Sequence, residues 1–348
     1  MPRVIGIDPG TVSLDVCGLA DGRVDLDLTF PTADALADPE RFLAALTAGG
    51  RPDLVAGPSG YGLPLTRAAE ATEADLRLAF LAGPDEAGGI GGLRRFARQL
   101  GASGLPVVYT PGVIHLDTVP AYRKLNRVDM GTADKVAVAA LAVEQQHQRT
   151  GRPLDQVSLI VLELGGAFTA ALAIHRGQIV DGVGGTSGPI GWQAAGALDG
   201  EVAYLAGGPI DKALLFQGGV ETVARSGPGG RLLAIEAYLE GAAKAVHLLR
   251  ASAPGADEVL VSGRAAADTD LVDRLAGMLK GVATVRPLTG FASAAKQGAQ
   301  GAALIADGLA GGRCAPLVRH LRIREASGSV LDHLHVISPE AARRRLTG

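Results

Sequence analysis

The chain is poor in the residues that mark several common classes of protein. It has two cysteines in 348 residues, Cys17 and Cys314, which excludes a disulfide framework and a metal cluster held by four cysteines of one chain. Aromatic residues make up only 4%, which disfavours an aromatic groove for nucleobases or peptides. The net charge of −3 provides no basic field for a nucleic-acid backbone. Composition therefore predicts no nucleic-acid partner.

Long apolar runs are also missing. No stretch approaches the roughly 18 uninterrupted apolar residues that a membrane-spanning helix needs. Near the start of the chain, Arg3 and Asp8 interrupt the apolar residues before a signal sequence of ordinary length could form. We therefore expect a cytoplasmic protein with no membrane partner.

Glycine, in contrast, is abundant. It accounts for 49 of the 348 residues, about twice the usual share of roughly 7%. Because glycine costs chain entropy on folding, this surplus indicates many tight turns or backbone segments that approach a ligand closely. Hydrophobic residues make up 47% and charged residues 20%, as in globular proteins. A globular chain of this length is expected to contain two domains.

One sequence pattern occurs twice, 155 residues apart. An apolar strand leads through a glycine turn into a second strand and a hairpin, first in residues 4–24 and again in residues 159–180. At this offset the acids and glycines align without a gap: Asp8 with Glu163, Gly10 with Gly165, and Gly22 with Gly177. The repeat predicts two homologous halves that begin with the same three-stranded meander.

Strands and helices alternate after each meander, which predicts α/β domains with mixed sheets flanked by helices. Further strands are expected at 53–57, 105–109, 258–262 and 283–285. Helices are expected around 40–48, 91–101, 133–149, 231–250, 269–279 and 293–309. We predict an N-terminal domain over 1–152, a C-terminal domain over 153–312, and an extension over 313–348 with three short strands or loops.

The two repeated turns have the residues of a phosphate site. Glycines let backbone N–H groups face a polyphosphate at short range, and hydroxyl side chains add donors. An acid at the end of the preceding strand suits Mg²⁺, and Asp8 takes this position. The expected phosphate-binding residues are Gly10, Thr11, Ser13, Gly165, Gly166 and Thr169. Hairpins also use such turns for geometry alone, so two matching turns are better evidence of a phosphate site than either turn by itself.

A third turn follows the strand expected at 258–262. Its residues Ser262, Gly263 and Arg264 could border the base and ribose of a nucleotide, or they could form an ordinary turn between a strand and a helix. In combination with the two phosphate turns, we predict that they border adenosine.

A charged cluster precedes the last helix expected in the first half. Arg123 and Arg127 are candidate cations for a transferred phosphate. Asp129 and Asp134 are candidates for binding the metal or the acceptor. A structural role is equally open, because Thr132 can cap the helix and Asp134 favours its positive end.

These motifs, in this order, resemble the actin-like ATPase superfamily of acetate and sugar kinases, actin and heat-shock ATPases. Within it, the acetate/butyrate kinase branch is most similar. Residues 5–11 resemble the first phosphate motif of that branch, usually Asn-Pro-Gly-Ser-Thr, and residues 162–181 resemble its second motif with the hairpin that follows. Residues 188–192 and 235–238 resemble later segments of predicted butyrate kinases. The resemblance covers roughly residues 3–310.

The resemblance implies two duplicated RNase H-like domains that close around ATP and Mg²⁺ in a cleft between them. The chain departs from the family at Glu163, where the second motif usually begins with His, and at Gly263-Arg264, where the third usually has Gly-Gly. The arginines expected near 188–196 and 57–62 are absent. The residues near those places are Ser59, Tyr61 and Gln193.

The predicted function is ATP- and Mg²⁺-dependent transfer of a phosphoryl group to a small carboxylate, as in a butyrate-like kinase. One alternative is a slow ATPase that acts as a nucleotide-dependent regulatory switch. Another is a sugar or polyol kinase, in which an aspartate would act as general base on a hydroxyl. By analogy with the family, a homodimer is one option.

Overall fold

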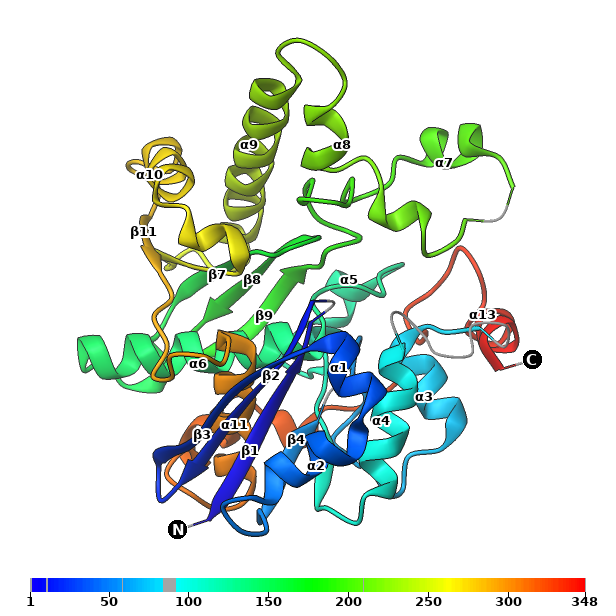
Figure 1. Cartoon of the computed structure of the whole chain (residues 1–348). Helices are drawn as coiled ribbons and strands as arrows, with labels where there is room; N and C mark the ends of the chain where they lie inside the picture. The colour runs from blue at the N-terminus through cyan, green and yellow to red at the C-terminus, as the bar shows by residue number, and fades with distance from the viewer. Residues whose placement is uncertain (1, 11, 58, 84–91, 209, 348) are drawn as a thin grey trace.

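Two mixed β-sheets, one from each half of the chain, form the framework of the protein (Figure 1). The computed structural model describes residues 2–10, 12–57, 59–83, 92–208 and 210–347. The described strands of the first sheet are β1 (Arg3–Pro9), β2 (Ser13–Ala20), β3 (Arg23–Pro31), β4 (Leu54–Gly57), β5 (Thr66–Arg67) and β6 (Val107–Tyr109). Those of the second are β7 (Leu159–Leu164), β8 (Thr169–His175), β9 (Gln178–Val183), β10 (Glu258–Ser262) and β11 (Thr284–Pro287). Their orders are β3-β2-β1-β4-β6-β5 and β11-β10-β7-β8-β9.

Helices flank both sheets, as the sequence predicts. The first half contains α1 (Thr32–Ala37), α2 (Pro39–Thr47), α3 (Glu73–Phe80), α4 (Leu93–Ala102), α5 (Ala121–Lys124) and α6 (Ala133–Thr150). The second half contains α7 (Gly200–Ala206), α8 (Val220–Ala224), α9 (Gly230–Arg250), α10 (Thr269–Met278), α11 (Gln297–Leu309), α12 (Ala315–His320) and α13 (Pro339–Thr347). Every helix expected from periodicity is present within a few residues of its predicted bounds. Short helices such as α3 and α7 were not predicted, because one or two turns carry little periodic signal.

The repeated meander is visible in the details of the backbone. In both halves the first three strands pair antiparallel, and both hairpins turn through two residues with positive φ, at Asp21–Gly22 and at Arg176–Gly177. The pairing shifts once in each meander, between Gly18 and Leu19 and between Ala173 and Ile174. These features lie 155 residues apart, so the repeat in the sequence corresponds to a repeat in the structure.

The central strands are buried on both faces, which is why their sequences are almost continuously apolar. On β7, Ile160 and Leu162 pack in the cluster that contains α9 and α10, while Leu159 and Val161 face the space between the sheets. On β1, Ile5 packs in the cluster that contains α2 and α4. The space between the sheets is therefore a shared core rather than an empty gap.

Two helices lie in that shared core: α6, the last helix of the first half, and α11, the last helix before the tail (Figure 1). Although α11 comes from the second half, it packs against β1, β2 and β4 of the first sheet. In turn, α6 contacts β7 and β8 of the second sheet, and the two helices pack against each other. Their contact is very close, because a Cβ on Gly301 would overlap the carbonyl oxygen of Ala137. The division into residues 1–152 and 153–312 stays a prediction, since the two halves share this helix pair.

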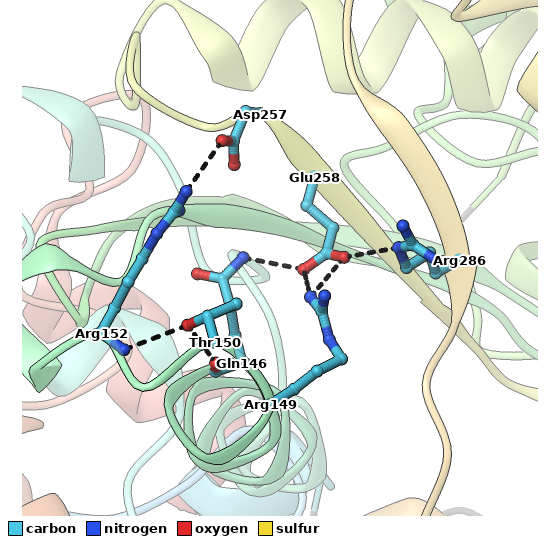
Figure 2. Close-up of polar contacts among 7 residues, drawn as sticks. All are labelled: Gln146, Arg149, Thr150, Arg152, Asp257, Glu258 and Arg286. Atoms are coloured by element: carbon cyan, nitrogen blue, oxygen red, sulfur yellow. Dashed lines mark hydrogen bonds and ion pairs between the residues drawn. The ribbon is translucent and has the colours of Figure 1, made fainter.

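The buried carboxylate of Glu258 links the carboxyl-terminal end of α6 to the second sheet through hydrogen bonds (Figure 2). Glu258, at the start of β10, is 5% exposed and accepts hydrogen bonds from Gln146 at 2.8 Å and from Arg149 at 2.5 Å. The Nε of Arg286 on β11 lies 3.1 Å from the same carboxylate. A buried charge with several charged and polar donors is well compensated, so this cluster holds α6 on the second half.

The tail over residues 313–347 contains helices joined by loops, so the loops that were expected there are present and the short strands are not. Its apolar residues do not alternate along an edge but pack in the shared core between the sheets, where Leu317 and Leu331 are buried. Asn126 accepts backbone hydrogen bonds from His335 at 2.7 Å and from Val336 at 3.0 Å, and α13 lies against α3. Within the described residues, no helix is both long and apolar enough to cross a membrane.

The contact between α6 and α11 gives a direct test by substitution. Gly301→Ala places a methyl group against backbone, so we expect it to destabilise the protein by about 1–3 kcal/mol. Gly277→Ala, in α10, is the matched control because a Cβ there meets nothing within 4 Å. It should stabilise the protein by about 0.5–1 kcal/mol. Urea unfolding measures both changes, and equal effects of the two substitutions would contradict the packing.

Candidate active site

A cavity of about 670 Å³ is lined by residues of both halves. Its walls come from the ends of β1 and β7, from the turns that follow them, and from the amino-terminal ends of α6 and α11. The predicted site residues that line it are Asp8, Gly10, Ser13, Asp129, Asp134, Gly165, Gly166, Gly263 and Arg264. Thr11 lies outside the described residues. The cavity thus brings together the three turns that the sequence singles out.

The two acid–glycine turns have matching geometry. The N–H of Gly10 donates to the carbonyl oxygen of Ser13 at 2.8 Å, and the N–H of Gly165 donates to that of Phe168 at 3.0 Å. These two N–H groups close their own turns. The glycines therefore contribute a wall without side chains, against which a ligand can lie at short range.

Three acids and a lysine meet in one wall of the cavity. The Nζ of Lys135 lies 2.5 Å from Oδ2 of Asp134 and 2.8 Å from Oε1 of Glu163. Burial raises the pKa of Asp8 to about 7, and repulsion from Asp134 and Glu163 adds to this shift. Burial also raises the pKa of Glu163, although Lys135 opposes the change. Because the carboxylates outnumber the nearby lysines, this wall favours an additional cation.

The residues fit a magnesium site completed by a ligand. Carboxylate oxygens are suitable donors for Mg²⁺, which commonly takes one or two of them together with phosphate and water oxygens. Asp8 and Asp134 both line the cavity, and burial together with the charges of Asp134 and Glu163 raises the pKa of Asp8. In the described parts of the chain, no group of three or more His, Cys, Asp or Glu side chains is arranged to bind a metal unaided.

A second lysine lies beside the first turn. The Nζ of Lys296 donates to Oγ of Ser13 and lies 3.1 Å from Oδ2 of Asp15, which is 1% exposed. The hydroxyl of Ser13 donates to Asp15 in turn, at 2.8 Å. Since its proton is used in this bond, Ser13 orients Lys296 rather than offering a donor to a phosphate.

The third turn packs directly on the second. Gly263 has φ of +88°, and a Cβ there would stand 2.5 Å from the carbonyl oxygen of Leu164 and 2.9 Å from the nitrogen of Gly165. Only glycine fits this position without moving the Gly165 turn. Arg264 follows it and lines the cavity.

A further part of the cavity lining, which we call the aromatic end, carries the rings of Tyr61, Phe168 and Phe216. The Nζ of Lys212 lies 5.4 Å from the ring centre of Tyr61, and the rings of Phe168 and Phe216 meet edge to face at 4.9 Å. Asp129 is held here, because its Oδ2 accepts hydrogen bonds from both the N–H and the hydroxyl of Thr186, each at 2.9 Å. Ser59 and Gln193 also line the cavity, as does Thr110. This end therefore combines apolar surface with fixed polar groups.

Four predicted site residues do not line the cavity. Arg123 donates instead to the carbonyl oxygen of Val180 at 2.7 Å, and its Nε lies 3.7 Å from Oδ2 of Asp181. Arg127 is exposed, because the loop turns at Asn126, whose φ is +54° and whose side chain binds the tail. Thr169 and Ser262 are 0% and 1% exposed and lie behind the wall. Thr169 is the first residue of β8 and Ser262 the last of β10, so their side chains follow the alternation of the strand and not the turn.

Three lysines of the cavity, Lys135, Lys212 and Lys296, are not among the residues predicted from the sequence. Lys296 immediately precedes the small-residue helix α11. Lys212 lies between two segments with no periodic pattern. The useful signal for Lys296 was a single charged residue at the start of a helix whose first ten residues carry no other charge.

The family model described as "Protein of unknown function (DUF1464)" matches residues 6–336. The chain belongs to this family. Among solved structures, an acetate kinase from Entamoeba histolytica is 13% identical, with a TM-score of 0.59 over 80% of this chain and 87% of that one. A propionate kinase from Francisella tularensis is 14% identical, with a TM-score of 0.59 over 86% and 99%. A comparison with curated proteins found no match.

Sequence identities of 13% and 14% show a shared fold and no more. The chain has the two-sheet fold of these kinases, that of actin-like ATPases, over most of its length, which confirms the predicted fold class. The narrower assignment to the butyrate kinase-like branch stays a prediction, because a likeness at this level does not transfer a substrate.

The third turn can be tested with a pair of glycines that share a positive φ. Gly263→Ala and Gly281→Ala both introduce a strained backbone, at a cost of about 1–2 kcal/mol each. Only Gly263→Ala also pushes on the Gly165 turn, since a Cβ on Gly281 meets nothing within 4 Å. We expect the Gly263 variant to lose more stability and to lose nucleotide binding, measured by thermal unfolding with and without Mg-ATP. Equal nucleotide-induced shifts in both variants would contradict this arrangement.

Proposed function

We propose that the protein is an ATP- and Mg²⁺-dependent phosphotransferase that acts on a small molecule. The observation that carries this proposal is the meeting of two matched acid–glycine turns, one from each half, in the walls of one cavity. A third turn packs against the second and supplies a further wall without a side chain. Such an arrangement suits a polyphosphate with a nucleoside at one end.

Each part of the cavity then has a role in binding. Gly10, Gly165 and Gly166 let the phosphates approach the backbone, while Gly263 and Arg264 border the adenosine. Asp8 would hold Mg²⁺, with Asp134 in the same wall as a second oxygen donor or as a partner of a water ligand. A metal held there would supply positive charge against the charge that develops on the phosphates during transfer.

The acceptor belongs at the aromatic end, and we propose a short-chain carboxylate. Lys212 and Tyr61 are placed to contact a carboxylate, and the rings of Phe168 and Phe216 offer surface to a short alkyl chain. In the reaction, a carboxylate oxygen attacks the γ-phosphorus in line, the bond to the bridging oxygen breaks, and ADP leaves. The acetate and propionate kinases of similar fold support this acceptor class.

Asp129 favours a second candidate, a kinase for a hydroxyl acceptor such as a sugar or polyol. Asp129 is 7% exposed, and hydrogen bonds from Thr186 hold its carboxylate at the aromatic end. A fixed carboxylate in that place suits a general base, which a hydroxyl needs and a carboxylate does not. The identity of the acceptor therefore depends on whether Asp129 receives a proton or only orients Thr186.

ADP release from Mg-ATP, measured with acetate, propionate, butyrate, glucose and glycerol, distinguishes these functions. Hydroxylamine added to the same assays traps an acyl phosphate as a hydroxamate. Hydroxamate formation selects the carboxylate kinase, and stimulation by a polyol alone selects the hydroxyl kinase. Slow ADP release that no acceptor stimulates selects the regulatory ATPase, and no nucleotide turnover or binding would contradict the proposal.

Substitution of Asp8 tests the proposed metal site most directly. Asp8→Ala removes the proposed metal ligand, so we expect kcat for ADP release to fall by about 100-fold or more. Asp155→Ala removes an exposed acid outside the cavity and should keep the original rate. Thermal unfolding of both variants confirms that they are folded. Full activity of Asp8→Ala would exclude the metal role.

A further inference from the structure

The two glycine turns each receive a lysine from a helix of the opposite half. Lys135, in the first turn of α6, pairs with Glu163 beside the second-half turn. Lys296, immediately before α11, lies beside the first-half turn, where its Nζ is 3.4 Å from the position a Cβ on Gly10 would occupy. The exchange follows from the crossed packing of α6 and α11, and it places one cation at each turn.

The two lysines differ in what remains available to a ligand. Lys135 has carboxylate partners at 2.5 Å and 2.8 Å, and its side chain is 17% exposed. Lys296 has one carboxylate partner, Asp15 at 3.1 Å, and one hydroxyl partner, and its side chain is 50% exposed. An ammonium group has three donors, so two partners leave one N–H of Lys296, which lines the cavity, for a ligand.

The backbone before Lys296 is held in place by the first sheet. Asp27 on β3 accepts hydrogen bonds from the N–H groups of Ser293 at 2.8 Å and of Ala295 at 2.6 Å. Asp15 is fixed as well, because its Oδ1 accepts a hydrogen bond from Thr29 at 2.7 Å. The backbone before Lys296 and the carboxylate that its ammonium group contacts are therefore both held before any ligand binds. This reduces the entropy lost on binding.

The other cations that line the described cavity have different places. Lys212 lies over Tyr61 at the aromatic end, and Arg264 follows the third turn. Lys135 is held between two carboxylates. At the first glycine turn, where the phosphates of a nucleotide would pass, the cation in place is Lys296.

We propose that Lys296 binds the β- or γ-phosphate of the nucleotide and stabilises the charge on it during transfer. This inference rests on the proposed function, because it assumes a nucleotide in the cavity. Asp15 and Ser13 act as positioning residues that hold the ammonium group.

Binding of AMP, ADP and ATP, measured by calorimetry in the presence of Mg²⁺, tests the role of Lys296. In Lys296→Gln the amide can still donate to Asp15, so the buried acid keeps a partner. We expect about 10- to 100-fold weaker binding of ATP and an AMP affinity within about twofold of the original. Lys296→Arg should recover part of the loss. Lys244→Gln, which removes an exposed lysine on α9, is the charge-matched control and should bind like the original protein.

The outcomes separate this inference from the proposed function. If the unmodified protein binds no nucleotide, the proposed function fails. If it binds ATP and Lys296→Gln binds ATP equally well, or loses AMP and ATP affinity to the same extent, the role of Lys296 is wrong and the proposed function stands. If Lys296→Gln does not fold, the Lys296→Arg variant is compared with the original for the ratio of ATP to AMP affinity. An unchanged ratio there contradicts the inference.

Discussion

The close packing of α6 against α11 is the contact on which the cavity depends. Each helix ends one half of the repeat and lies against the sheet of the other half, and Gly301 lets the backbones approach to contact at Ala137. Both helices begin at the cavity, so their separation sets the distance between the two turns. The Glu258 cluster fixes the far end of α6, which leaves the amino-terminal end as the part that faces ligand.

This packing also explains the charge of the site. It brings the acids of two strand ends and one helix start into a region where they are removed from water, and the lysines of the two helices offset only part of that charge. A protein selected for stability alone would not collect Asp8, Asp134 and Glu163 in one wall. Sites that violate a folding preference in this way are commonly functional, since a charged ligand completes them.

Several site residues could be predicted because their role is local. Asp8, Gly10, Gly165 and Gly263 occur at strand ends and turns, where residue type and spacing in the chain already limit the geometry. Arg127 could not be placed in the same way. Its direction depends on Asn126, which binds backbone groups of the tail more than 200 residues away.

The amino-acid sequence by itself determined the repeat, the order of strands and helices, and the three turns, because these follow from short-range periodicity and from the conformational limits of glycine. Tertiary structure alone decided that Lys135 and Lys296 stand at the turns of the opposite half, that Ser13 bonds to Asp15, and that the tail contains helices. Those outcomes depend on which segments far apart in the chain pack against one another, and no local pattern contains that information.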